Sequence, residues 1–432
     1  MTDKKKNREY KPLPLFDTLD HHVHMHADYE NPFTKEIAKK HLDHLYQLTD
    51  IVLTDEHVFD YFCAHLFLYE YRGSSETFNA YRRELDRFIQ WTWFVKNSYL
   101  KKIKKNHLEE FIEFCQNPPK NWIGEKVVSR YLWINTSKVS HPEWKPFVVK
   151  VKKADFKNGH VPEKEKFNFS SSALKQTFSI ISSFYENLIH MELNTVNPVK
   201  QIRQKSKFIV KESFKRPVRR LSRIQWNAVL EACQTLSHDD SRIDERTEFM
   251  IHLLFGLYLR ISEMTASKRW NPVMSDFYKD SQGNWWFQTV GKGNKKRIIA
   301  VSDETLECLK KYRIKRGLDA LPVLGENTPL IEKVKGKGAL SSTRLVRQHI
   351  QICFDKAFEI LKHQNENEEA VNLRHATVHW LRHTGISEDV KIRPREHVRD
   401  DAGHSSSMTT DRYIDVDLLE RAQSAKNKKL TF

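Results

Sequence analysis

Residues 403–413 read GHSSSMTTDRY, a short polar stretch that begins near His404 and ends on Tyr413, nine positions later. A second dense patch lies upstream, where residues 379–383 read HWLRH. A tyrosine phenol can act as a nucleophile, and cationic or hydrogen-bonding side chains can bind phosphoryl oxygens. The two patches together therefore indicate a site that attacks a phosphate.

The composition limits the kind of protein this is. With 432 residues the chain is long enough for two or three domains, and 39% hydrophobic residues can supply their cores. We expect no membrane contact, since no apolar run reaches the ~18 residues of a membrane-spanning helix. The basic N-terminus lacks the apolar segment of a signal peptide. Reduced, intracellular thiols are expected for five scattered cysteines without a Cys-x-x-Cys pair: Cys63, Cys115, Cys233, Cys308 and Cys353.

The charge balance points to a partner. The chain has 72 lysines and arginines against 56 acids, a net charge of +16. An excess of this size favours a polyanion, and nucleic acid is the first candidate. A basic protein that is merely soluble is the alternative.

Residues 1–54 are predicted to be an N-terminal extension. Within it, residues 20–26 read DHHVHMH. Alternating histidines can ligate a transition metal, but no second group of ligands is evident. We therefore expect a solvated, partly ordered segment and no metal site.

Residues 55–202 are predicted to form a helical domain, because apolar residues recur there at helical spacing. The rhythm breaks at about 121–168, where residues 144–153 alternate like a strand, and this part is interpreted as an insertion. Arg82, Arg83 and Arg87 lie on the face opposite an apolar stripe and are candidate DNA contacts.

A basic linker is predicted at 203–221. From Arg203 to Arg223 there are nine cations and one acid, Glu212. Such a segment is expected to lie along phosphates, and a solvated tether is the alternative. The candidate DNA contacts here are Lys207, Lys211, Lys215, Arg216, Arg219 and Arg220.

A second domain is predicted from residue 222, where Ser222 and Gln225 match a capping box. Arg260 and Glu263 stand three apart among large apolar residues, so the arginine is expected to be paired or to bind a ligand. Residues 284–290 and 296–301 are predicted strands. The turn between them places Lys292 between two glycines, free to reach outward.

These motifs together resemble the tyrosine recombinase (phage integrase) family over about residues 221–420. The matching segments are LRISE at 259–263, GKGNKKR at 291–297, HWLRHT at 379–384, and GHSS at 403–406 with Tyr413. The resemblance implies a mainly α fold with a small antiparallel β-sheet. A helical core-binding domain would precede a mixed α/β catalytic domain at 222–415, and a C-terminal tail would follow at 416–432.

The resemblance also implies roles for the residues. Arg260 and Arg382 would clamp the nonbridging oxygens of a phosphodiester, where charge develops in the transition state. His379 and His404 would donate further hydrogen bonds to the same phosphate.

Tyr413 would attack phosphorus, forming a 3′-phosphotyrosyl link and releasing a 5′-hydroxyl. Lys292 would protonate the leaving oxygen, and Glu263 would order the site around Arg260 and His379. Neither a cofactor nor a metal is implied.

The expected function is a site-specific DNA recombinase or integrase of a mobile element, located in the cytoplasm on the nucleoid. Its partners would be double-stranded DNA, accessory DNA-bending or directionality factors, and further copies of itself. A homotetramer would act on synapsed DNA, with monomers or dimers in solution. The alternatives are a topoisomerase-like or end-resolving strand transferase, and a catalytically silent DNA-binding relative.

The chain departs from the family pattern before Gly403. Asp400, Asp401 and Ala402 stand where the family usually has apolar residues. The packing of the segment that presents His404 is therefore expected to differ. Arg374-His375, Tyr278 and Tyr312 resemble parts of the motifs, but they lack the flanking residues and are interpreted as structural or solvated.

Overall fold

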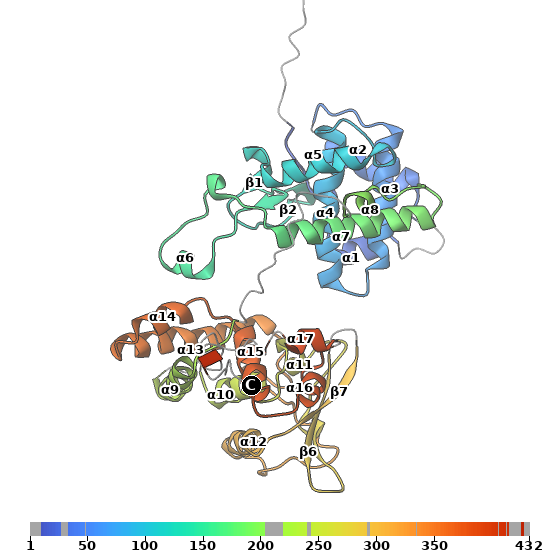
Figure 1. Cartoon of the computed structure of the whole chain (residues 1–432). Coiled ribbons are helices and arrows are strands. Elements are labelled where there is room, and N and C mark those ends of the chain that lie inside the picture. Colours follow the sequence, from blue (N-terminus) through green and yellow to red (C-terminus); the bar gives the residue numbers. More distant parts are fainter. Residues whose placement is uncertain are drawn as a thin grey trace, which may run out of the picture. The chain divides into compact units, whose positions relative to one another are not determined.

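The computed structural model describes residues 10–26, 33–47, 49–203, 219–239, 243–291, 294–333, 335–404, 406–411, 413 and 425–426. The chain divides into two compact units, residues 1–212 and 213–432 (Figure 1). Among the described residues, no helix is both long and apolar enough to cross a membrane.

The first unit is mainly helical. Its helices are α1 Leu19–His24, α2 Lys35–Tyr46, α3 Asp55–Glu70, α4 Ser75–Phe94, α5 Lys105–Gln116, α6 Lys153–Lys157, α7 Ser171–His190 and α8 Pro198–Arg203. Its short strands are β1 Ile123–Gly124, β2 Tyr131–Ile134, β3 Ser137–Ser140 and β4 Phe147–Val148.

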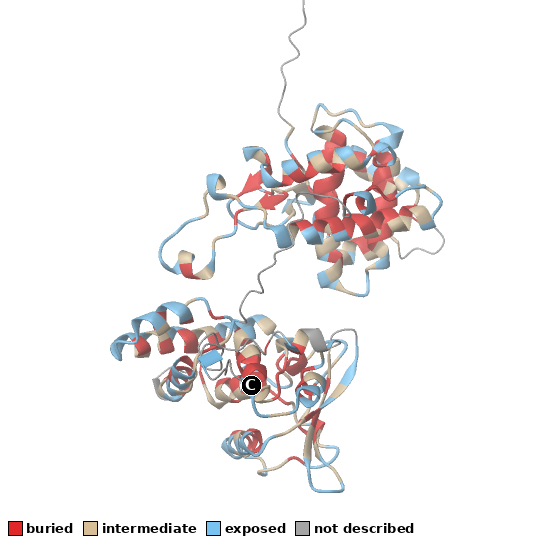
Figure 2. Ribbon diagram, in the orientation of Figure 1, coloured by how far each residue is buried: buried red, intermediate tan, exposed pale blue. Residues whose placement is uncertain are grey.

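Helix α4 lies at the centre of this unit. It begins where the Ser74 hydroxyl accepts a hydrogen bond from the Thr77 backbone N–H, a typical N-cap. Every residue from Glu84 to Trp93 is buried, which Figure 2 shows as a continuous red stretch. A helix that is apolar on one face only would leave the other half exposed, so the neighbouring elements must surround α4.

Residues 10–26 and 33–47 pack into this core instead of extending from it. Leu15, Phe16 and Leu42 are fully buried, and the Leu15 N–H donates to Asp86 of α4 over 2.8 Å. The expectation of a solvated histidine segment is wrong, since His22 is only 1% exposed. The apolar residues around the histidines, which look sparse in the sequence, are enough to anchor it.

The predicted insertion contains two small sheets. Strands β1 and β4 pair in parallel, with Ile123 opposite Phe147, and β2 pairs with β3 as an antiparallel hairpin. Of the alternating stretch 144–153, only Phe147–Val148 forms a strand. Phe147 is fully buried, so the insertion contributes to the core of the unit.

The second unit joins helices to one antiparallel sheet. Its helices are α9 Arg223–Asp239, α10 Glu245–Gly256, α11 Ile261–Met264, α12 Asp303–Lys315, α13 Thr343–His363, α14 Asn367–Leu373, α15 Val378–Asp389, α16 Arg395–Ala402 and α17 Ser407–Asp411. Its strands are β5 Phe277–Lys279, β6 Trp285–Val290 and β7 Lys296–Ala300, in the order β5-β6-β7.

The predicted hairpin is confirmed, with Val290 of β6 opposite Lys296 of β7. Helix α10 packs against α12 and α15, and α16 packs against β7. At Gly385 of α15 an added Cβ would overlap the Phe255 carbonyl oxygen, so α15 and α10 meet at backbone distance. These contacts bring α11, α15, α16 and β7 together at one end of the unit (Figure 1).

Candidate active site

Arg260 is the N-cap residue of helix α11 and is held by Glu263. The Arg260 Nη1 donates to Glu263 Oε1, and the Arg260 backbone N–H donates to Glu263 Oε2, both over 2.8 Å. Glu263 is buried, whereas the Arg260 side chain is 31% exposed. The predicted pairing is therefore present, and part of the guanidinium still faces outward.

Arg297 of β7 is a residue that the sequence analysis missed. Its Nη2 donates to Glu263 Oε2 and its Nη1 donates to the Ala402 carbonyl, each over 2.8 Å. The side chain thus joins the Arg260 segment, the hairpin and the end of α16. The sequence does contain a hint of this role, because Arg297 ends the GKGNKKR segment. Its partners, however, lie far away in the chain.

Gly403 ends α16 in the left-handed conformation, with φ 65°. A Cβ there would approach Arg297 Nη1 to 2.7 Å. Glycine therefore satisfies both the backbone and the packing, and it directs the chain from α16 into His404.

Arg382 of α15 is 2% exposed. Its guanidinium donates to the carbonyls of Tyr258 and Ala402, and Nη2 lies 3.5 Å from His404 Nε2. Burial, and then the nearby Arg260 and Arg297, lower the pKa of Arg382 to about 9. The group still carries its charge at neutral pH, so three cations stand close together here.

The imidazoles and the tyrosine converge beside Arg382. His404 Nδ1 lies 2.9 Å from Thr410 Oγ1, and the His404 and Tyr413 rings stack with centroids 5.6 Å apart. His379 and His383 meet edge to face at 4.5 Å. The Tyr413 hydroxyl lies 2.6 Å from His383 Nδ1. The structure therefore brings five of the six predicted catalytic residues together and adds His383 to them.

These histidines are uncharged at neutral pH. Burial is the main cause, and neighbouring positive charges add to it. The pKa values of His383 and His404 are lowered to about 4, and the pKa of His379 is also lowered. An uncharged imidazole can still donate one hydrogen bond to a phosphate and accept another.

The acidic segment before Gly403 has a structural explanation. Asp401 is buried, accepts hydrogen bonds from Arg393 Nη2 and from the Ala300 N–H, and so ties α16 to β7. Asp400 is exposed and pairs with Arg399. Polar contacts of Asp401 therefore pack the end of α16 against β7.

Several predicted residues lie outside the described part of the chain. They are the catalytic candidate Lys292 and the linker candidates Lys207, Lys211, Lys215 and Arg216. Arg219 is exposed, and Arg220 Nη1 lies 4.0 Å from Glu388 Oε1.

The three arginines of α4 do not form one exposed face. Arg87 is buried, and its guanidinium pairs with Glu84 Oε2 at 2.8 Å and donates to the Pro146 carbonyl. Arg82 donates to the Asp17 carbonyl and to Asn79. Arg83 is 47% exposed and pairs with Glu84. The insertion covers this face of α4 and buries Arg87. This placement speaks against a contact between Arg87 and DNA.

A histidine cluster lies in the first unit. His65 of α3 supplies the second group that the sequence did not reveal: its Nδ1 lies 2.7 Å from His26 Nε2, and its carbonyl oxygen lies 2.9 Å from His22 Nε2. Ligand atoms of the three residues lie within 4.8 Å of one another. However, the His22 and His65 rings stack at 3.6 Å, so their lone pairs do not meet at one point, as zinc ligation requires. In this arrangement His22 and His65 are core residues, and His26 packs beside them half-buried.

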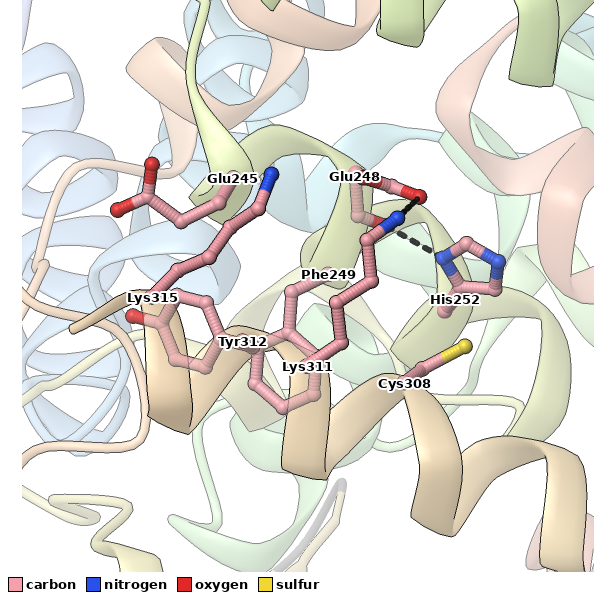
Figure 3. A pocket seen from close by; sticks show the side chains of 8 residues that line it. All are labelled: Glu245, Glu248, Phe249, His252, Cys308, Lys311, Tyr312 and Lys315. Atoms are coloured by element: carbon pink, nitrogen blue, oxygen red, sulfur yellow. Dashed lines mark hydrogen bonds and ion pairs between the residues drawn. The ribbon is translucent and has the colours of Figure 1, made fainter. Parts of the chain in front are cut away.

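A small pocket between α10 and α12 lies apart from this site in the second unit (Figure 3). An ion pair between Lys311 Nζ and Glu248 Oε1, 2.8 Å long, spans it. Tyr312, which the sequence analysis interpreted as structural or solvated, lines the pocket. Its ring stacks on Phe249 with centroids 4.3 Å apart, which confirms a structural role.

Comparison with known proteins identifies relatives of the chain. Residues 219–419 match the phage integrase family. Tyrosine recombinase XerD of Rickettsia conorii is 30% identical over 151 residues, which is 35% of this chain and 46% of that protein. XerD of Chlorobaculum tepidum is 23% identical over 259 residues, or 60% of this chain and 75% of that protein. The chain thus spans about half the length of the first of these relatives.

Among solved structures, the XerH site-specific recombinase bound to a palindromic difH substrate, in its post-cleavage complex, aligns with a TM-score of 0.49. The sequence identity is 17%, and the alignment covers 96% of this chain and 100% of that one. A λ integrase dimer bound to a core site aligns with a TM-score of 0.44 and 13% identity, covering 83% of this chain and 93% of that one.

Proposed function

We propose, from the match of residues 219–419 to the phage integrase family, that this chain is a site-specific DNA recombinase that breaks and rejoins DNA through Tyr413. The observation that carries the proposal is the gathering of Arg260, Arg382 and the His404–Tyr413 stretch from three separate segments around one place. A purely structural role for Arg260, Arg297 and Arg382 so close together would be costly, because cations repel one another where water is excluded.

The phosphate would bind among these cations. Arg382 is held by two backbone carbonyls, so its position is fixed, and its hydrogen bonds within the described part of the chain do not include a carboxylate that would neutralise it. Arg260 shares Glu263 with Arg297 and is partly exposed. A phosphodiester oxygen placed there would meet donors that need no rearrangement, which is how preorganised sites stabilise developing charge.

Strand cleavage would then follow from the tyrosine. The Tyr413 oxygen attacks phosphorus, a covalent phosphotyrosine forms, and the bond to the 5′-oxygen breaks. Lys292, which lies between β6 and β7 in the sequence, is proposed to give that oxygen its proton. The bond energy kept in the intermediate allows rejoining to a second 5′-hydroxyl without a nucleotide cofactor.

The wider assignment belongs to the same proposal. We expect double-stranded DNA as substrate, a homotetramer on two synapsed sites, and a mobile element as the biological context, with the protein acting on the nucleoid. The cations of 203–221 are proposed to follow DNA phosphates between the core-binding and catalytic parts. Accessory bending or directionality factors would bind beside the complex.

Covalent capture tests the activity without knowledge of the target site. The full-length protein is incubated with a randomised duplex library that carries nicks, so that a short fragment diffuses away after cleavage and traps the intermediate. Denaturant-resistant adducts are isolated and their DNA sequenced. We expect adducts joined through a 3′-phosphate and enriched in one sequence. None should form with Tyr413→Phe.

The control is Tyr312→Phe, at a buried tyrosine outside the site, which should form adducts like the unmodified protein. The absence of any adduct with the unmodified protein, or an adduct that persists in Tyr413→Phe, would contradict the assignment.

A further inference from the structure

The nucleophile has a hydrogen-bond partner that the family resemblance did not supply. The hydroxyl of Tyr413 lies 2.6 Å from Nδ1 of His383, a residue of α15 that directly follows Arg382. Tyr413 is 7% exposed, so this contact is made in a site that largely excludes water. A short contact between a phenol and an imidazole nitrogen is the geometry from which a proton can be transferred.

We propose that His383 is a catalytic residue that accepts the proton of Tyr413 as the phenol oxygen attacks phosphorus. The inference rests on the proposed function, since it concerns the first step of that reaction. It assigns to the chain a general base at the nucleophile, in addition to the general acid expected at the leaving group.

The other two histidines are less well placed for this role. Both ring nitrogens of His404 have near neighbours: Nδ1 lies 2.9 Å from Thr410 Oγ1, and Nε2 lies 3.5 Å from Arg382 Nη2. Its ring stacks on Tyr413 with an interplanar angle of 14°, so its nitrogens do not point at the phenol oxygen. His379 meets His383 edge to face and is the more exposed of the two.

His383 is uncharged at neutral pH and can therefore accept a proton. Burial, followed by His379, Arg382 and His404, lowers its pKa to about 4, so Nδ1 has a free lone pair at neutral pH when Nε2 carries the proton. A bound phosphodiester adds a negative charge beside the ring. That charge raises the pKa of His383 and strengthens the base when substrate is present.

The proton of the Tyr413 hydroxyl moves to His383 Nδ1, which becomes an imidazolium. The oxygen lone pair forms the bond to phosphorus, the bond from phosphorus to the 5′-oxygen breaks, and that oxygen takes a proton from the acid proposed at Lys292. In rejoining, His383 returns its proton to the tyrosine as the phosphotyrosine bond breaks.

The test separates the base from the acid by the choice of leaving group. Single-turnover cleavage is measured for His383→Asn and Lys292→Ala on two versions of a captured DNA site, one with the normal 5′-oxygen and one with a bridging 5′-sulfur. Sulfur leaves as a stable thiolate and needs no proton. We expect both variants to cleave the oxygen substrate about 10²-fold more slowly than the unmodified protein, as for loss of a general acid or base.

On the sulfur substrate, Lys292→Ala should recover and His383→Asn should not. DNA affinity should be unchanged in both, and His375→Asn, at an exposed histidine upstream of the motif, should behave like the unmodified protein.

A second measurement replaces Tyr413 by a fluorinated tyrosine whose phenol has a lower pKa. The cleavage rates of the otherwise unmodified protein and of His383→Asn are compared when both carry this tyrosine. The difference between the two rates should shrink, because a more acidic phenol needs less help from a base.

Three results would overturn the inference: cleavage by His383→Asn at the normal rate, its recovery with sulfur, or a slow rate matched by an equal loss of DNA affinity, which would indicate a structural role. These outcomes require that the unmodified protein forms an adduct. If it forms none, the proposed function fails, and that failure is distinguishable from failure of the role of His383.

Discussion

Two buried arginines, Arg87 of α4 and Arg382 of α15, have opposite surroundings. Arg87 meets a buried carboxylate, Glu84, at 2.8 Å. Arg382 donates hydrogen bonds to two carbonyls, and burial, followed by two nearby arginines, lowers its pKa. Burial of a charge is tolerated when the charge is paired, so Arg87 is explained by the fold itself. Arg382 is explained better by an anion that binds from outside, and the difference separates a structural from a functional arginine.

The largest expected effect is the loss of Arg382. Arg382→Ala should lower single-turnover cleavage by about 10³-fold or more, as for loss of a transition-state arginine at a phosphoryl group. The melting temperature should change little, because removal of the charge also relieves its repulsion with Arg260 and Arg297. The measurement is a cleavage time course on captured DNA beside a thermal melt. If Arg382→Ala instead lowers the melting temperature strongly and leaves cleavage per folded molecule normal, Arg382 is a structural arginine like Arg87.

Arg87 should give the reverse result. Arg87→Ala leaves Glu84 buried with a weaker set of partners, so the first unit should lose about 3 kcal/mol of unfolding free energy. Urea denaturation monitored by tryptophan fluorescence measures this loss. The double variant Glu84→Leu, Arg87→Met, which removes both charges, should recover most of the stability. If Arg87→Ala has normal stability and binds DNA more weakly, Arg87 contacts DNA, as the sequence analysis expected.

The smallest expected effect concerns pH. Burial lowers the pKa of His22 to about 3 from 6.5, so the unfolded chain binds a proton there that the folded unit does not. Stability is therefore complete above about pH 6.5 and is lost progressively as the pH falls from there towards 3. At pH 5 the loss from His22 alone should be about 2 kcal/mol.

Urea titrations at about pH 7 and pH 5 measure this effect. His22→Gln should flatten the dependence and the exposed His24→Gln should not. An unchanged slope in His22→Gln would show that other groups cause the acid sensitivity.

The sequence predicted the second unit better than the first for a physical reason. The hairpin of β6 and β7 and the pairing of Arg260 with Glu263 are local, so spacing alone reveals them. The contacts of Arg297 with Ala402 and of Tyr413 with His383 join residues 105 and 30 positions apart, and no periodic pattern records them. The same holds for Arg87, whose position opposite an apolar stripe predicts exposure until the insertion covers it.

The burial of the histidines near the N-terminus also depends on a contact with a distant residue. Read alone, residues 20–26 look too polar to be buried, but His65, stacked against both His22 and Phe33, supplies an aromatic environment from 43 positions beyond His22. An uncharged imidazole behaves as a flat, weakly polar ring that can be buried. The composition of the segment does not show whether its histidines are charged.

Gly385 sets a limit on how the site can vary. Because the backbone of α15 touches the carbonyl of Phe255 there, even one methyl group would push the helix outward. Arg382 and His383 stand just before it on the same helix, so such a displacement would carry both away from Tyr413 and Ala402. Random mutagenesis that selects for cleavage should therefore leave position 385 invariant, although no atom of its side chain takes part in the chemistry.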